Sequence, residues 1–200
     1  MTIPTLRQQL KTQRQQLTSQ QQNDYSAMMV NHLSQTTLYQ QARTIALYLP
    51  VKGEADPRAL FTKNTDKAKK FYLPVLSNRP HLPLHFVQWH QKTAFKDNIY
   101  GIPEPLYTKK ETLVVTQLDV VVMPLLGFDP YGNRLGMGGG YYDRSFAFKN
   151  SEKNIHTKQV VSKPLLVGYA YSFQQQTQLI TQPWDIPLDA YVTENHFKKI

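Results

Sequence analysis

Residues 118–143 read LDVVVMPLLGFDPYGNRLGMGGGYYD, and this stretch decides the fold. Its first part, Leu118 to Met123, is apolar at every position except Asp119, which is typical of a strand buried on both faces of a sheet. Its last part places four of the nine glycines within five residues, directly before Tyr141 to Phe148, which has a helical pattern. Strand, glycine loop and helix in this order predict an α/β fold with a loop that can cradle an anion.

Short apolar runs on both sides of this stretch predict the rest of the sheet. Strands are expected over residues 44–51, 71–76, 84–90, 165–171 and 190–193. Helices are expected over 4–17, from Ser19 or Asn23 past Leu33, and from Asp56 as the N-cap to about Lys69. Residues 149–163 form a polar connector, a loop with a helical turn. This alternation indicates one α/β domain over residues 1–200, with three layers, a mostly parallel sheet and helices on both faces.

The composition excludes several kinds of site. The chain has no cysteine, so a disulfide, a zinc-thiolate site and a thiol nucleophile are all excluded. His81, His85 and His90 lie on one stretch without ligand spacing, and no metal is assigned to them. The sequence shows neither an apolar signal core at its start nor an apolar run approaching about 18 residues. We therefore expect a soluble, cytoplasmic protein with no membrane partner.

The formal net charge of +9 admits three interpretations. A basic protein can bind nucleic acid, can bind an anionic small substrate such as a nucleotide, or can simply have a solvated basic surface. The lysines and arginines are scattered, with no run above three, and are not interleaved with aromatic residues along one segment. The pattern argues against a nucleic-acid partner and leaves the other two interpretations open.

The glycine segment is too rich in glycine for a turn. A turn needs one or two glycines, whereas four cost backbone entropy, which favours a loop whose N–H groups converge on an anion. The segment is not a Walker A loop, because no Gly-Lys-Ser or Gly-Lys-Thr follows. It is not the dinucleotide fingerprint either, because Tyr141 stands where the third glycine belongs. A nucleotide bound here is bound by neither common motif.

Charged residues near the loop have two interpretations each. Asp143 directly follows the loop, where a carboxylate can hold a Mg²⁺ ion that bridges phosphate oxygens, or can simply stabilise a first helical turn. Arg7, Lys11 and Arg14 share one face of the first expected helix, either as ligands of an anion or as a solvated surface.

The segment RLGMGGGYYDR, preceded by DVVVMPLLGFDPYG, resembles the signature of the 5-formyltetrahydrofolate cyclo-ligase family. Weaker likenesses occur in order along the chain: Leu6-Arg7 with Arg14, IALYLPVKGE, YGIPEP, VGYAYSFQ and WDIPLDAYVTE. The resemblance implies an α/β fold similar in shape to the ribose-phosphate isomerase and CoA-transferase group. It implies an enzyme that uses ATP to phosphorylate the formyl oxygen of 5-formyltetrahydrofolate and closes it to 5,10-methenyltetrahydrofolate, releasing ADP and phosphate.

The resemblance also implies site residues. The residues that bind ATP are Arg7, Arg134, Leu135, Gly136, Met137, Gly138, Gly139, Gly140, Tyr141 and Tyr142. The residues that contact the folate are Arg7, Leu49, Glu54, Tyr100, Met137, Gly138, Gly139, Gly140 and Tyr141. Arg7 and Glu54 are the implied catalytic residues, and Asp143 and Asp185 are the implied Mg²⁺ ligands. The implied partners are the folate, in free or polyglutamylated form, and ATP, bound by a monomer.

The sequence departs from the family pattern at Ile3, where relatives often have a lysine. One phosphate cation is therefore missing or is replaced by Lys11 or Arg14. Arg144 occurs in only some relatives and is not assigned to the site. Two of the implied residues also have plain alternatives, because Asp185 could be a turn residue and Tyr100 could belong to the core.

Two rival functions remain open on sequence alone. A basic nucleic-acid-binding module would bind single-stranded RNA with a strong dependence on salt. A sugar-phosphate isomerase or CoA-transferase of related shape would need a catalytic carboxylate in the glycine region and no nucleotide. Dependence on ATP separates these enzymes from a cyclo-ligase.

Overall fold

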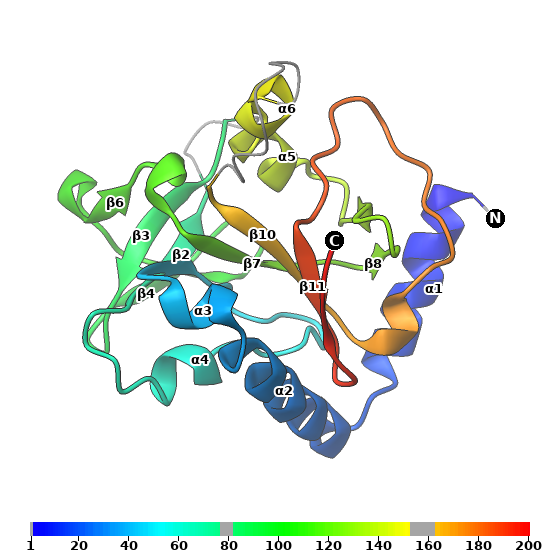
Figure 1. The fold of residues 1–200 in the computed structure, drawn as a ribbon, viewed down its shortest axis with the longest axis horizontal. Coiled ribbons are helices and arrows are strands. Elements are labelled where there is room, and N and C mark those ends of the chain that lie inside the picture. Colours follow the sequence, from blue (N-terminus) through cyan, green and yellow to red (C-terminus); the bar gives the residue numbers. More distant parts are fainter. Residues whose placement is uncertain (1, 77–81, 153–162) are drawn as a thin grey trace.

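The computed structural model describes residues 2–76, 82–152 and 163–200, and its centre is an eight-stranded sheet (Figure 1). The strand order is β12-β11-β10-β7-β1-β2-β3-β6. The five central strands are parallel: β1 (Thr44–Ala46), β2 (Lys70–Val75), β7 (Val120–Pro124), β10 (Leu165–Tyr169) and β11 (Ala190–Val192). Antiparallel strands extend both edges: β3 (His85–Trp89), β6 (Thr112–Leu113) and β12 (Phe197–Lys199). The prediction of a mostly parallel sheet is confirmed.

Alternate residues of the central strands point into two different cores. Val120 and Val122 pack on the face covered by α2 (Ser19–Ser34), α3 (Thr37–Gln41) and α4 (Ala59–Thr62). Val121 and Met123 pack on the opposite face, toward α5 (Tyr141–Ser145) and α6 (Phe148–Glu152). Because both faces are covered, each central strand is apolar at consecutive positions, which is the pattern that made β7 recognisable in the sequence.

The order of the parallel strands fixes where a ligand can bind. In chain order the five strands are β1, β2, β7, β10 and β11, so their order across the sheet is 2-1-3-4-5. The chain first moves outward from β1 to β2 and then returns to the other side of β1 with β7. In open sheets of this kind the loops after the two strands diverge at their carboxyl ends and leave a crevice there for a ligand. The site is therefore expected where β1 and β7 end.

The helices follow the sequence pattern except after β1. Thr2 caps α1 (Ile3–Gln15), and Thr18 caps α2 with a capping box, as their sequences favour. The prediction of a helix from Asp56 to about Lys69 is wrong, because α4 spans only Ala59–Thr62. The Asp56 carboxylate instead accepts the backbone N–H and the guanidinium of Arg58, so it closes a local turn and leaves α4 without a side-chain cap.

Two further expectations need correction. The expected strand over residues 44–51 is regular only in β1, and the chain beyond Ala46 continues as the loop that carries Glu54. The expected helix over residues 141–148 is broken between α5 and α6. Most of the expected connector over 149–163 lies outside the described residues.

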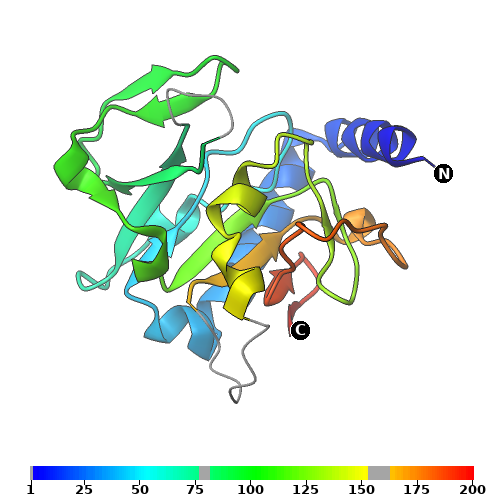
Figure 2. The ribbon, with the colours of Figure 1, turned by 90° about the horizontal axis from the view of Figure 1, so that it is seen from above.

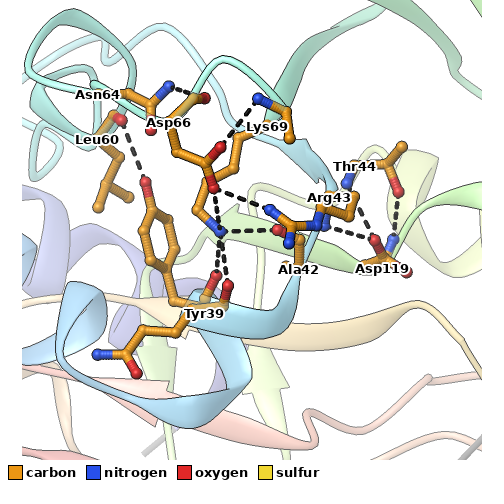
Figure 3. A network of polar contacts seen from close by, with 11 residues as sticks. Tyr39, Ala42, Arg43, Thr44, Leu60, Asn64, Asp66, Lys69 and Asp119 are labelled. Carbon is orange, nitrogen blue, oxygen red and sulfur yellow. Dashed lines mark hydrogen bonds and ion pairs between the residues drawn. The ribbon is translucent and has the colours of Figure 1, made fainter.

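The amino ends of β1, β2 and β7 are closed by polar contacts of the protein itself (Figure 3). The Lys69 ammonium donates hydrogen bonds to the carbonyl oxygens of Tyr39, Gln40 and Ala42, at 2.8 to 2.9 Å, which satisfies the carbonyls that end α3. Since these groups bind one another, the amino end of the sheet has a structural role and the carboxyl end is the open one.

Asp119 completes this network and has an unusually low pKa. Its carboxylate accepts the backbone N–H groups of Arg43 and Thr44 and the ammonium of Lys163. Burial alone would raise the pKa of Asp119, but these hydrogen bonds outweigh burial and lower the pKa to about 2.

The low pKa predicts how stability depends on pH. The unfolded pKa of an aspartate is about 3.9, so the stabilisation by Asp119 is complete above about pH 4 and is lost as the pH falls toward 2. Because Asp119 and Lys163 are both partly exposed, we expect Asp119→Asn to lower the free energy of unfolding by only about 1 kcal/mol at pH 7. Urea unfolding of both proteins at pH 7 and pH 3 checks this. A difference that does not shrink at pH 3 would contradict the assigned pKa.

Candidate functional site

The glycine segment begins at a turn held by one buried aspartate. Strands β8 (Gly127–Phe128) and β9 (Arg134–Leu135) form a hairpin after β7. Between them the fully buried Asp129 accepts the backbone N–H groups of Tyr131, Asn133 and Leu179. Our sequence analysis did not single out Asp129, although an Asp-Pro-x-Gly turn is a recognisable signal. This carboxylate fixes where the glycine segment leaves the sheet.

The glycine segment exposes backbone to the crevice. Gly138 and Gly140 have φ values of +98° and +62°, a left-handed backbone that other residues rarely adopt. Between Leu135 and Tyr141 the only side chain is that of Met137, which is half exposed. The backbone N–H groups of this loop can therefore approach an anion closely. The α5 helix that follows has only five residues, so the loop itself and nearby cations must provide the positive potential.

Arg7 lies against this loop. Its Nε donates a hydrogen bond to the carbonyl oxygen of Gly136 at 3.0 Å, and its guanidinium is the nearest group to a side chain built at Gly138. Helix α1 is held there by a small apolar cluster of Leu10, Leu126, Leu135 and Leu179. Ile3 packs against the same cluster, so the residue at the position of the family lysine makes an apolar contact and provides no cation.

Tyr100 and Arg144 both meet Tyr141 at the end of the loop. The hydroxyls of Tyr100 and Tyr141 are 3.0 Å apart, and Tyr100 is exposed, so it does not belong to the core. The Arg144 guanidinium lies 4.9 Å from the centre of the Tyr141 ring, and a Cβ built at Gly140 would be 2.8 Å from its Nη1. Sequence reasoning left Arg144 out. Its position four residues after Gly140, one helical turn away, is the signal that could have included it.

Glu54 lies on the loop that follows β1 and contacts α1, the helix that also carries Arg7 to the glycine loop. Its side chain is 10% exposed and pairs with the buried Arg14, whose Nη1 is 3.4 Å from Oε1. Burial raises the pKa of Glu54, while the charge of Arg14 opposes that rise. The charge of Glu54 in turn adds to the burial that raises the pKa of Tyr142, which places Tyr142 at the end of the glycine loop within electrostatic reach of Glu54. Leu49 is half buried on the same loop and packs against the core below it.

A hollow of about 240 Å³ opens beside Glu54. The residues that line it are Gln22, Asn23, Ser26, Pro50, Gly53, Glu54, Asp56 and Arg58. A larger hollow, of about 540 Å³, lies by the turn after β3 and contains none of the residues expected in the site. Size alone would favour the larger hollow. The chemistry favours the region of Glu54, because α1 brings Arg7 to the glycine loop and Arg14 to Glu54, on loops that follow adjacent parallel strands.

Of the two aspartates expected to hold Mg²⁺, Asp143 contacts the segment that carries Asp185. The Asp143 carboxylate accepts hydrogen bonds from Nη2 of Arg134 at 2.5 Å and from the backbone N–H of Ile186 at 3.1 Å. Ile186 directly follows Asp185. The Asp185 carboxylate accepts the backbone N–H of Gln182, as a turn residue does. Arg134 also donates to the carbonyl oxygen of Ile186, so it clamps this segment to the glycine loop.

The described residues contain neither a ready-made metal cluster nor a membrane-spanning helix. Within residues 2–76, 82–152 and 163–200, no three His, Asp or Glu side chains gather as a set that could hold a metal ion. In the same part of the chain no helix is long and apolar enough to cross a bilayer.

Comparison with known proteins identifies the family. The model of the 5-formyltetrahydrofolate cyclo-ligase family matches residues 2–194. The chain belongs to this family. It is 37% identical to the 5-formyltetrahydrofolate cyclo-ligase of Haemophilus influenzae over 186 residues, which cover 91% of this chain and 94% of that protein. It is 38% identical to the 5-formyltetrahydrofolate cyclo-ligase of Escherichia coli over 152 residues, 76% of this chain and 78% of that one.

Solved structures of the family share the fold. The NMR structure of Aquifex aeolicus 5,10-methenyltetrahydrofolate synthetase matches all of this chain and 93% of its own, with a TM-score of 0.80 and 30% identity. A 5,10-methenyltetrahydrofolate synthetase from Mycoplasma pneumoniae matches 97% of this chain and 99% of its own, with a TM-score of 0.70 and 26% identity.

The cyclo-ligase residues expected from the sequence fall into two groups that the fold brings together. The first group is the glycine loop with Arg7 and, through Tyr141, Tyr100. The second is the loop after β1 with Glu54, and α1 contacts both groups through Arg7 and Arg14. The candidates for the missing cation were Lys11 and Arg14: Lys11 is partly exposed on α1, and Arg14 is bound to Glu54. Arg144, which was not assigned to the site, lies at the loop. The individual roles of these residues stay predictions.

Proposed function

We propose that this protein binds ATP on the glycine loop and 5-formyltetrahydrofolate beside Glu54, and joins N10 of the folate to its formyl carbon. The observation that carries the proposal is the place of the glycine segment, at the carboxyl end of β7 with Arg7 against it, in a chain that the family model matches almost throughout. We further propose that the protein acts as a cytoplasmic monomer of one domain and accepts the folate in free or polyglutamylated form.

The phosphates of ATP are proposed to lie along Gly136 to Gly140. Backbone N–H groups would hold their oxygens, and Arg7 and Arg144 would offset their charge from the two ends of the loop. Arg134 holds Asp143 and Ile186, so we propose that it keeps the shape of the loop as well as adding positive charge. The pterin is proposed to lie on the side of Glu54 and Leu49, with Tyr100 and Tyr141 packed against the folate.

The reaction explains why the site holds cations and glycines and needs no serine or cysteine nucleophile. The formyl oxygen attacks the γ-phosphorus of ATP, and ADP leaves. N10 of the folate then attacks the formyl carbon and loses its proton, and phosphate leaves with the former formyl oxygen. Phosphoryl transfer depends mainly on positioning and on neutralising charge, with little covalent work for the protein. Glu54 and the glycine loop would hold the formyl group and the γ-phosphate in line.

Asp143 and Asp185 are proposed to hold Mg²⁺. Mg²⁺ in phosphoryl-transfer sites is commonly held by one or two carboxylates together with substrate phosphates and water, so a cluster of three protein ligands is not required. Within the part of the chain that the structure describes, one oxygen of each carboxylate accepts hydrogen bonds, which leaves acceptor positions for an ion. A bound Mg²⁺ would neutralise charge on the phosphates.

Turnover of the purified protein tests the proposed function. Mixing it with 5-formyltetrahydrofolate, ATP and Mg²⁺ should produce the absorbance of 5,10-methenyltetrahydrofolate, and leaving out ATP should abolish the signal. EDTA should stop turnover and added Mg²⁺ should restore it. No product with ATP present would contradict the proposed function, whereas full turnover in EDTA would contradict only the metal assignment.

Glu54→Gln should weaken the binding of folate and leave the binding of ATP unaffected. A carboxylate that faces pterin N–H groups makes charge-assisted hydrogen bonds of roughly 1.5–3 kcal/mol each, and the amide replaces one acceptor oxygen with a donor. We expect the folate Kd to rise about tenfold or more, since about 1.4 kcal/mol corresponds to a factor of ten. Calorimetry measures the two ligands separately. Equal losses for both ligands, with a lower melting temperature, would instead indicate misfolding.

A further inference from the structure

Arg14 is one of the most deeply buried charged residues of the described chain. Its side chain is 2% exposed, and it extends from α1 to the loop that follows β1. Nε donates to the carbonyl oxygen of Lys52 at 3.1 Å, and Nη1 lies 3.4 Å from Oε1 of Glu54. Burying a guanidinium is costly unless it is paired and hydrogen-bonded, so these two contacts determine where the side chain lies.

The loop that Arg14 contacts has an unusual backbone. Lys52 and Gly53 both have a left-handed φ, of +50° and +79°, which a non-glycine residue such as Lys52 adopts only when its surroundings hold it there. A Cβ built at Gly53 would lie 3.1 Å from the Arg14 carbonyl oxygen, so this backbone is packed directly against α1. At the end of the loop, Oε2 of Glu54 accepts the backbone N–H of Val51 at 3.2 Å.

We infer that Arg14 is a positioning residue for the folate: it holds the loop over residues 51–54 in this conformation and thereby aims the Glu54 carboxylate into the crevice. The inference rests on the proposed function of Glu54. A carboxylate has about four acceptor positions, and the contacts with Arg14 and Val51 use two. The remaining two can accept N–H groups of a pterin, in a geometry that the two existing contacts fix.

Arg14 differs in this from Arg7, which lies two helical turns away on the same face of α1. Arg7 donates a hydrogen bond to the glycine loop, whereas Arg14 donates its hydrogen bonds to Lys52 and Glu54 on the loop after β1. We therefore expect Arg14 to act on the folate alone, through Glu54, whereas Arg7 should act on both the phosphates and the folate.

Because of the charges around Glu54, the inferred role of Arg14 predicts how folate binding depends on pH. The groups that face it are Arg14 from α1, Lys52 from its own loop, Tyr48 from the chain after β1 and Tyr142 from α5. Burial raises the pKa of Glu54, and Arg14 is the strongest of the groups that lower it. Without Arg14 the carboxyl should stay protonated to a higher pH, and the folate, which needs the carboxylate as acceptor, should bind poorly until the pH rises above that value.

The test measures the Kd of 5-formyltetrahydrofolate and of ATP separately by calorimetry, between pH 6 and 9. The variants are Glu54→Gln, Arg14→Lys, Arg14→Met and the double variant Arg14→Lys/Glu54→Gln, each with a thermal melt. Arg14→Lys keeps the buried charge but cannot bind both Lys52 and Glu54 as the fork of arginine does, so it is the variant expected to fold well. It should raise the folate Kd about tenfold and leave the ATP Kd within about twofold. Arg14→Met should lose folate affinity at pH 6 to 7 and regain part of it toward pH 9.

The double variant distinguishes positioning from stability. If Arg14 acts through Glu54, the double variant should bind folate no more weakly than Glu54→Gln alone, within about twofold. Losses that multiply in the double variant, or a folate Kd for Arg14→Lys equal to that of the wild type, would overturn the inference. Failure of the wild type to bind 5-formyltetrahydrofolate, or a Glu54→Gln variant that binds it normally, would contradict the proposed function itself.

Discussion

Gly139→Val should abolish measurable ATP binding while the protein still folds. A Cβ at Gly139 would lie 2.9 Å from Cε2 of Tyr141, so the ring must turn away and release its contact with Tyr100. The valine would also block the close approach of phosphate oxygens to the loop backbone. Losing two charge-assisted hydrogen bonds, at about 1.5–3 kcal/mol each, corresponds to a fall in affinity of more than about 100-fold.

Gly136→Ala is the matched comparison within the same loop. A Cβ at Gly136 meets no atom within 4 Å, and the residue does not have a left-handed backbone, so this variant should lose much less affinity than Gly139→Val. Calorimetry with ATP measures both variants, and a thermal melt confirms that each is folded. An unchanged ATP Kd in Gly139→Val would show that the phosphates bind elsewhere.

Arg7→Ala should reduce kcat/KM for ATP by about 100-fold and should weaken the binding of folate as well. The guanidinium lies against the glycine loop, and removing it would take away the proposed charge-assisted contact with phosphate together with the hydrogen bond to the Gly136 carbonyl. Two such losses amount to about 3 kcal/mol, which corresponds to a factor of about 100. Steady-state kinetics with each substrate varied in turn measures the effect.

Arg43→Ala controls for the loss of one positive charge. Arg43 is exposed at the amino ends of the strands, where it pairs with Asp66 (Figure 3), far from the glycine loop along the sheet. Its removal should leave kcat/KM within about twofold. If both variants lost activity equally, net charge and not the position of Arg7 would explain the result.

The sheet and the glycine loop could be predicted because their signals are local. Leu118 to Met123 is apolar at every position except one, as a strand covered on both faces must be, and the glycine segment follows it after a single hairpin. The position of the crevice also follows from sequence, since both candidate loops come after strands that pair in parallel. The family resemblance supplied the residues that local patterns do not distinguish from surface, such as Glu54.

Features that depend on distant contacts could not be predicted. The helix expected after Asp56 is short because the Asp56 carboxylate binds Arg58, and alternatives of this kind differ by little free energy. Arg14 looked like a solvated residue or an anion ligand, and only the fold shows that it meets a carboxylate 40 residues away. Arg144 was set aside for a similar reason, because nothing in its neighbourhood along the chain shows that its guanidinium returns to Gly140.

Helix α1 contacts both halves of the site. Its two contacts close loops of unequal length along the chain. Figure 2 shows the helix at the edge of the molecule, where it is attached through its own small apolar cluster. Arg14 and Glu54 are 40 residues apart, whereas Arg7 and Gly136 are 129 apart. The entropy lost in closing a loop grows with its length, which favours the shorter closure by about 1 kcal/mol. During folding, the contact between Arg14 and Glu54 on the folate side should therefore form before the contact between Arg7 and Gly136 on the nucleotide side. On heating, detachment of α1 should begin at Arg7, so phosphate binding should be lost while the central sheet is still intact.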